Sequence, residues 1–217
     1  MQYHNYIFLS SNFGLRNLSQ KDLLSYKKEF VKMLKIEKGV LINTFTTIGL
    51  KVNTNILLWF QSDSLEDIQN HLNKLMHTKL GKYLTITYTL FGMTRPTQYS
   101  PKSIGYLETD HKGGKYLIIY PFSKTKEWYQ INYDTRRKLM GGHITFGKKH
   151  PKINQLLLYS YGVDDNEFIV SYETDDLSDF QTLVMELRSD KVRAYTLKDT
   201  PIFTCIHKST EKILDYI

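Results

Sequence analysis

Cysteine is almost absent from this sequence, because only Cys205 among 217 residues carries a thiol. One thiol cannot close an intramolecular disulfide. It also excludes a thiolate zinc cluster and the C-x-x-C-H motif that attaches haem covalently. A chain without disulfides suits a reducing compartment, so we expect a cytoplasmic protein.

Long apolar runs and blocks of basic residues are absent as well. No stretch approaches 18 uncharged apolar residues, so no membrane span is expected. The residues from Met1 to Phe13 lack the basic start and apolar core of a secretory signal. The formal net charge is +7, but the lysines and arginines are scattered, which argues against a nucleic-acid partner. The surplus suits a small polyacidic partner, or no specific partner at all.

The histidines show no metal-binding spacing. Neither H-x-x-x-H nor H-E-x-x-H occurs among the 7 histidines. A single imidazole is too little for zinc or non-haem iron. It is enough for haem, because the macrocycle supplies four nitrogens and the protein supplies one axial ligand.

Strand and helix patterns alternate twice in the order β-α-β-β-α-β, which is typical of ferredoxin-like units. In the first half we expect strands at residues 6–9, 40–48, 55–60 and 83–90. The two expected helices are residues 20–34, capped by Ser19, and a segment that begins at Ser64. In the second half the expected strands are residues 115–121, 153–161, 168–173 and 202–207, and the expected helices are residues 134–147 and 178–188.

The two halves also resemble each other in sequence. Residues 56–69 align without gaps to residues 168–181, an offset of 168 − 56 = 112 residues, and share identical residues at the strand–helix junction. An internal repeat explains this match, and chance similarity of two such junctions is the alternative. We predict an α+β fold in which tandem ferredoxin-like repeats form a dimeric α+β barrel within the chain. The expected parts are residues 1–95, a linker at 96–114 rich in proline and glycine, and 115–217.

Sliding the second half onto the first points to His143 and Tyr120, which stand where the first half has Val31 and Ser10. His143 lies on the apolar stripe of its expected helix. A lone histidine there is more commonly a core residue than a ligand. The preceding Gly141 and Gly142 cost about 1 kcal/mol each within a helix. They suit the close approach of a flat ligand such as haem, or of a tightly packed helix.

Several segments of the second half resemble the chlorite dismutase family, and within it the branch of coprohaem decarboxylases, also called haem-dependent peroxidases. Residues 120–124 (YPFSK) with Trp128-Tyr129 resemble the Y-P-x-x-K…W-Y motif of that branch. Residues 136–143, 162–168, 173–177, 187–188 and 199–203 continue the match in order. The resemblance is dense from about residue 115 to 207, and the first half matches only in architecture.

The resemblance implies a role for individual residues. His143 corresponds to the axial iron ligand, with Leu139 beside it on the same helix. Tyr120 corresponds to the tyrosine that forms a radical near a propionate. The remaining positions contact propionates, protons or the porphyrin edge: Lys124, Arg188 and Trp128.

Gln155 falls at the distal position, where chlorite dismutases proper carry arginine. The resemblance therefore favours the decarboxylase branch over chlorite decomposition. The segment between His143 and Gln155 is one residue shorter than the family pattern. Leu156 is therefore the competing candidate for the distal position, and an apolar residue there would weaken peroxide activation.

The function implied by the resemblance is peroxide-dependent oxidative decarboxylation of coprohaem III to haem b by a homopentamer. A tetra-anionic substrate suits the basic side chains of Lys124, Arg136, Arg137, Arg188 and Arg193. Each of these alone is more commonly a solvated surface charge. The alternatives are a haem-dependent peroxidase-like protein with another substrate, and a haem-free oligomeric binding module.

Overall fold

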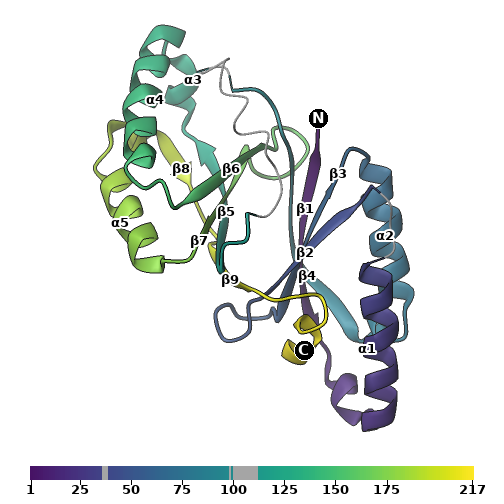
Figure 1. Cartoon of the computed structure of the whole chain (residues 1–217). Helices are drawn as coiled ribbons and strands as arrows, with labels where there is room; N and C mark the ends of the chain where they lie inside the picture. Colours follow the sequence, from purple (N-terminus) through teal and green to yellow (C-terminus); the bar gives the residue numbers. More distant parts are fainter. Residues whose placement is uncertain (36–38, 98, 100–111) are drawn as a thin grey trace. The chain divides into compact units, whose positions relative to one another are not determined.

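The computed structural model describes residues 1–35, 39–97, 99 and 112–217. The chain forms two compact units, coloured along the sequence in Figure 1. Unit 1 comprises Met1–Met93 and Thr204–Ile217, and unit 2 comprises Thr94–Phe203. The sequence suggested that the second half extends to residue 217, but residues 204–217 belong to unit 1. Most of the expected linker at 96–114 lies outside the described residues.

Unit 1 is a ferredoxin-like sheet with two helices. Its elements are β1 (Tyr3–Ser11), α1 (Gln20–Leu34), β2 (Leu41–Thr46), β3 (Ile56–Ser62), α2 (Leu65–His77) and β4 (Leu84–Met93). The strand order is β4-β1-β3-β2, and the neighbours pair antiparallel. The strand β9 (Phe203–His207) returns from the far end of the chain and pairs with the edge strand β2.

The helix–sheet interface of unit 1 is filled with apolar side chains. The helices begin where serine hydroxyls accept backbone N–H groups, at Ser19 for α1 and Ser64 for α2. Phe30 of α1 is fully buried and packs in the same core cluster as Ile7 and Leu58. Complete burial of such a side chain contributes about 1.5–3 kcal/mol. Unit 1 is therefore held together by an ordinary hydrophobic core.

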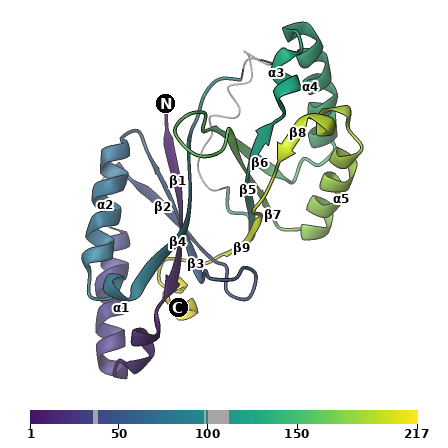
Figure 2. The same cartoon turned by 180° about the vertical axis from the view of Figure 1, so that it is seen from behind.

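Unit 2 repeats this plan with additions. Its elements are β5 (Tyr116–Lys124), α3 (Lys126–Gln130), α4 (Tyr133–Lys148), β6 (Asn154–Tyr159), β7 (Phe168–Thr174), α5 (Leu177–Arg188) and β8 (Thr196–Lys198). The strands follow the order β6-β7-β5-β8, and α4 and α5 lie side by side over one face of the sheet (Figure 2). The starts of β7 and α5 lie 112 residues after those of β3 and α2 (168 − 56 and 177 − 65), which confirms the predicted repeat. The sequence did not predict α3 or β8.

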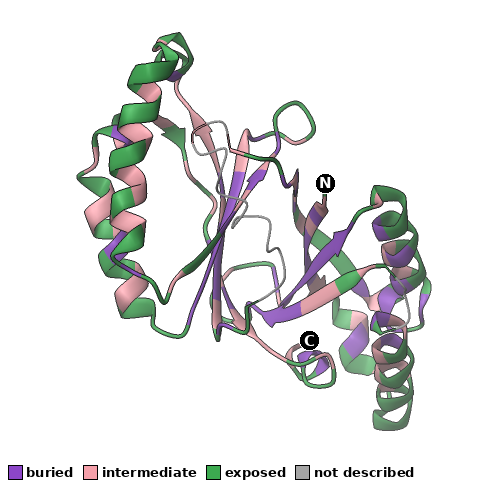
Figure 3. Ribbon diagram, turned by 45° about the horizontal axis from the view of Figure 1, so that its top comes forward, coloured by how far each residue is buried: buried purple, intermediate pink, exposed green. Residues whose placement is uncertain are grey.

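The helix α4 differs from α1 and α2 in what it covers. It contains no buried residue over its whole length, whereas α1 and α2 each bury part of one face (Figure 3). Its N-terminus is well formed, because the Asn132 side chain accepts the N–H of Thr135 at 2.9 Å. The inner face of α4 therefore does not pack tightly against the sheet of unit 2. No helix in the described part of the chain is long and apolar enough to cross a membrane.

Candidate active site

Unit 2 encloses a cavity of about 600 Å³ lined by its sheet and by α4 and α5. This volume is typical of sites for cofactors and small ligands. Six of the side chains to which the family resemblance assigns a role line the cavity: Tyr120, Lys124, Trp128, His143, Gln155 and Arg188. Leu139 is not among the lining residues, and the next residue, Met140, takes that place.

His143 presents its imidazole to the cavity from the middle of α4. Its Nδ1 lies 2.8 Å from Oδ2 of Asp190, a nearly buried carboxylate. This contact fixes the orientation of the ring and leaves Nε2 as the nitrogen available to a ligand. Burial lowers the pKa of His143 below its ordinary value, although Asp190 opposes the shift. The ring is therefore disposed to be neutral, as a metal ligand must be.

Asp190 is a functional candidate that the sequence did not reveal. It lies 47 residues from His143, beyond the reach of any helical or strand periodicity. Its other oxygen, Oδ1, accepts the N–H of Val192 at 3.3 Å and so caps the short helical turn at Lys191–Tyr195. A Ser-Asp pair after a helix would suggest such a cap, but not the contact with His143.

The glycines before His143 have no close neighbour in the described structure. A Cβ placed on Gly141 or Gly142 meets no atom within 4 Å, and neither residue lines the cavity. No second helix among the described residues approaches these glycines closely, and close approach of a ligand stays a prediction.

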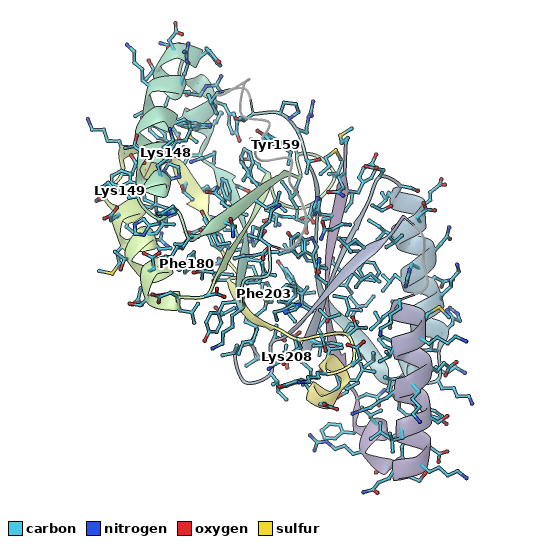
Figure 4. All side chains as sticks on the ribbon, in the orientation of Figure 1. Lys148, Lys149, Tyr159, Phe180, Phe203 and Lys208 are labelled. Carbon is cyan, nitrogen blue, oxygen red and sulfur yellow. The ribbon has the colours of Figure 1, made fainter. Side chains whose placement is uncertain are left out.

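The wall formed by β6 distinguishes Gln155 from Leu156. Gln155, Leu157 and Tyr159 line the cavity. Tyr159, the last residue of the strand, is labelled in Figure 4. Leu156 and Leu158 are buried and are not among the lining residues. Since successive side chains of a strand point to opposite faces, Gln155 and not Leu156 faces the cavity.

Tyr120 lies in the middle of β5, where the sequence placed it at a strand end. It pairs with Val170 of β7, while in unit 1 the corresponding Leu58 pairs with Ile7. The counterpart of Tyr120 is therefore the buried Ile7, and the assignment to Ser10 was wrong. Burial raises the pKa of Tyr120 above its ordinary value, and a hydrogen bond with Tyr172 opposes the shift.

The counterpart of His143 also changes when the helix caps are compared. His143 is the eleventh residue after Asn132 (143 − 132 = 11), and Phe30 is the eleventh after Ser19 (30 − 19 = 11). The position thus corresponds to Phe30, one residue before the Val31 expected from the sequence. Unit 1 places a fully buried phenyl ring where unit 2 places an imidazole beside a cavity.

Lys124 lies four residues after Tyr120 on β5 and also lines the cavity. Burial, followed by the positive charge of Arg193, lowers the pKa of Lys124 from 10.5 to about 8. Its ammonium group lies 4.9 Å from the ring centroid of the buried Trp128. A lysine with this pKa exchanges protons near neutral pH far more readily than an ordinary one.

Arginines give the cavity a positive charge. Arg188 and Arg193 both reach Oδ2 of Asp199, at 3.1 and 2.8 Å. One carboxylate thus faces two guanidinium groups, and a net positive charge remains. Arg95 and Arg136 also line the cavity, whereas Arg137 does not. This arrangement favours an anionic ligand.

Comparison with known proteins agrees with the fold and with the predicted resemblance. Residues 21–208 match the family model described as chlorite dismutase. A coproheme decarboxylase from Mycolicibacterium smegmatis is 23% identical over 195 residues, covering 89% of this chain and 84% of that relative.

Solved structures of chlorite dismutase from Candidatus Nitrospira defluvii resemble the whole chain. A doubly substituted variant superimposes with a TM-score of 0.90 at 24% identity, covering 99% of this chain and 94% of the other. The complex of that enzyme with imidazole gives a TM-score of 0.89 at 23% identity, with the same coverage. The predicted fold class, α+β with tandem ferredoxin-like repeats, is therefore confirmed.

Proposed function

Because the chain belongs to the chlorite dismutase family, whose members bind haem, we propose that it is a haem-dependent oxidoreductase with His143 as its axial ligand. The observation that carries this proposal is the imidazole at the cavity wall, oriented through Nδ1 by Asp190. We propose further that it converts coprohaem III into haem b with hydrogen peroxide. The similarity to a coproheme decarboxylase supports that substrate.

The residues of the cavity fit an iron porphyrin. No group of three potential metal ligands of the His, Cys, Asp or Glu type occurs among the described residues. A metal held by His143 therefore needs further ligands, which a macrocycle provides. The carboxylates of the porphyrin would be held by Arg188 and Lys124, its edge by Trp128, and the helix face beside His143 includes Leu139. When bound, the porphyrin iron supplies the chemistry that activates peroxide.

Tyr120 and Lys124 serve the decarboxylation itself. Residues four apart on a strand share a face, and both side chains line the cavity. Each propionate becomes a vinyl group and CO₂ by losing two electrons and one proton, and one hydrogen peroxide takes up the two electrons and, with two protons, becomes two water molecules. Tyr120 would relay these electrons one at a time, and the ring of Tyr172 stacks on it with the centroids 6.1 Å apart. Lys124 would bind the propionate as an ammonium and, in its neutral form, take up the released proton, as its lowered pKa allows.

Gln155 acts on the sheet side of the cavity. It provides a neutral amide that hydrogen-bonds to peroxide, without the positive charge of an arginine. We therefore propose that chlorite decomposition is not the activity of this protein.

A haem-dependent peroxidase with another substrate is the second candidate. Asp199 favours it, because this carboxylate already pairs with Arg188 and Arg193 and reduces the positive charge left for propionates. The family resemblance also implies a homopentamer, which sedimentation velocity would test.

Coprohaem titration of the purified apoprotein tests the proposal. We expect a Soret band at a stoichiometry of one porphyrin per chain, and loss of two carboxyl groups by mass spectrometry after peroxide is added. The variant Tyr120→Phe should bind coprohaem and leave its mass unchanged. Binding without any mass change in the wild type would favour the peroxidase. A missing Soret band would favour a haem-free binding module.

A further inference from the structure

Three side chains beside the cavity form a hydrogen-bonded chain that the proposed reaction does not use. Tyr161 Oη lies 2.7 Å from Tyr129 Oη. Tyr129 in turn donates its hydroxyl to Oε2 of Glu167 at 2.5 Å. Since the Tyr129 proton is engaged with Glu167, Tyr161 is the donor in the first of these bonds. The order is therefore Tyr161 to Tyr129 to Glu167.

The three side chains of this hydrogen-bonded chain come from different parts of unit 2. Tyr129 belongs to α3, and Tyr161 follows β6 with its ring 4.9 Å from that of Phe168. The same Glu167 oxygen accepts the backbone N–H of Lys124 at 2.7 Å, which anchors the carboxylate to β5. Both tyrosines line the cavity, and they are 41% and 44% exposed. The two tyrosines thus border the cavity and remain accessible to small molecules.

A tyrosine next to a carboxylate is suited to one-electron oxidation. Loss of an electron turns a phenol into a strong acid, so oxidation is easy only where a base can take the proton at the same time. Such transfer needs a base within hydrogen-bond reach. Burial, together with the neighbouring Glu167 and Tyr161, raises the pKa of Tyr129, so the phenol keeps its proton until it is oxidised.

Tyr120 differs in this respect. The side chain that hydrogen-bonds to it is Tyr172, a phenol and a poor base. Tyr120 is also more deeply enclosed in the sheet. The carboxylate of Glu167 therefore makes Tyr129 the better site for a radical that has to last.

We propose that Tyr129 is a second redox-active tyrosine, with Glu167 as its proton acceptor, at which small phenolic or enediol reductants deliver electrons. Tyr129 gives one electron to a one-electron oxidant in the cavity, and its phenolic proton moves to Oε2 of Glu167. The product is a neutral tyrosyl radical. A reductant from solution then returns the electron, and Glu167 returns the proton. This inference relies on the proposed function only for the natural oxidant, the peroxide-activated porphyrin.

Photochemical oxidation of the full-length apoprotein tests the inference without porphyrin. Tris(bipyridine)ruthenium(III), made by a light flash in the presence of persulfate, serves as the oxidant, and tyrosyl radicals are recorded by freeze-quench electron paramagnetic resonance. We expect a radical signal that Tyr129→Phe removes. Glu167→Gln keeps an oxygen acceptor but no base, and should slow radical formation by on the order of 100-fold.

Two matched variants serve as controls. Tyr133→Phe removes a tyrosine that is equally exposed, at 42%, and stacked on Tyr99. Asp175→Asn changes a carboxylate that also accepts a backbone N–H, that of Lys115. Both should retain the wild-type signal. A radical that survives Tyr129→Phe, or a rate unchanged by Glu167→Gln, would overturn the proposal.

Measurements on the wild type do not depend on how well the variants fold. Radical formation should be slower in D₂O, because the proton and the electron leave together. A spin trap should label Tyr129 or Tyr161 in preference to Tyr133, and ascorbate should suppress the labelling. Equal labelling of the three tyrosines would contradict the inference. Since no porphyrin takes part, failure here would leave the proposed decarboxylation standing, and the reverse also holds.

Discussion

The two units share one plan but use the space between helix and sheet differently. Unit 1 fills that space with a continuous apolar core, in which Ile7 and Phe30 are almost wholly buried. Unit 2 has Tyr120 and His143 at the corresponding positions and a cavity of about 600 Å³. At these two equivalent positions, the packed scaffold has apolar side chains, and the unit with the cavity has side chains that can ligate or be oxidised.

The charge distribution deepens this contrast. The cavity of unit 2 is bordered by Arg95, Lys124, Arg136, Arg188 and Arg193, with Asp199 as a partial counterweight. Charges near a poorly packed interior cost stability unless they meet a partner. Unit 2 thus holds groups that are more stable with an anionic ligand, while unit 1 needs none.

The largest expected effect comes from removing a large side chain from the packed core of unit 1. Phe30→Ala should lower the free energy of unfolding by about 3–5 kcal/mol, because it leaves a void in a filled core. His143→Ala, at the corresponding position, should lower that of the apoprotein by about 1–3 kcal/mol, because it opens no void in a filled core but leaves Asp190 without its ring partner. Urea unfolding of both variants measures this. Equal losses would show that the two interfaces are packed alike.

Gln155 and Leu156 allow the same contrast within one strand. Gln155→Leu should slow the reaction of the haem-loaded protein with peroxide by about 100-fold, because it removes a donor from the cavity. Leu156→Ala should instead reduce stability by about 2–5 kcal/mol and leave the peroxide reaction little changed. Stopped-flow spectroscopy and urea unfolding separate the two outcomes. The opposite pattern would mean that Leu156 is the distal residue.

A substitution of Asp190 tests how far haem binding by His143 depends on the carboxylate that orients its imidazole. Asp190→Asn should weaken haem affinity by about 10- to 100-fold, since an amide orients the imidazole less firmly than a carboxylate. Haem titration followed by the Soret band gives the dissociation constant. Asp179→Asn is a suitable control, because Asp179 of α5 contacts His150, just after the end of α4, at 2.6 Å. A comparable loss in the control would argue for a general effect on α4.

The last prediction concerns the lowered pKa of Lys124. The folded protein holds this lysine at a pKa of about 8, against 10.5 for an ordinary lysine. Between these two values the unfolded chain binds more protons than the folded one, so the stability of the apoprotein should rise from pH 8 to pH 10.5. Lys124→Met should flatten that rise. The urea concentration at the midpoint of unfolding, measured from pH 8 to pH 10.5 for the wild type and the variant, tests this. If the midpoints of both proteins change equally with pH, the pKa of Lys124 is not lowered.

Local signals in the sequence predicted the elements well. The helix expected at residues 20–34 has those bounds, and Ser19 and Ser64 are the caps. Capping and periodicity are properties of neighbouring residues, so a single sequence reveals them. The repeat was equally visible, because the strand–helix junctions at β3 and β7 keep one spacing.

Pairings between distant residues were not predictable in the same way. The contact between His143 and Asp190 depends on how α5 and the following turn return to α4. The counterpart of Tyr120 was misplaced because strand register follows from pairing, which letters alone do not fix. The helix α3 is only five residues long, too short for a periodic pattern. The choice between Gln155 and Leu156 likewise needed the strand bounds.

The return of β9 to unit 1 has a consequence for synthesis on the ribosome. Ile213 and Leu214, which follow β9, are buried in the core cluster that also contains Phe30. Unit 2 is therefore an insertion between two pieces of unit 1. Domains generally fold as units as they emerge, the N-terminal one first. Here unit 2 leaves the ribosome before the last piece of unit 1, so the scaffold is completed only after the site-bearing unit has been made.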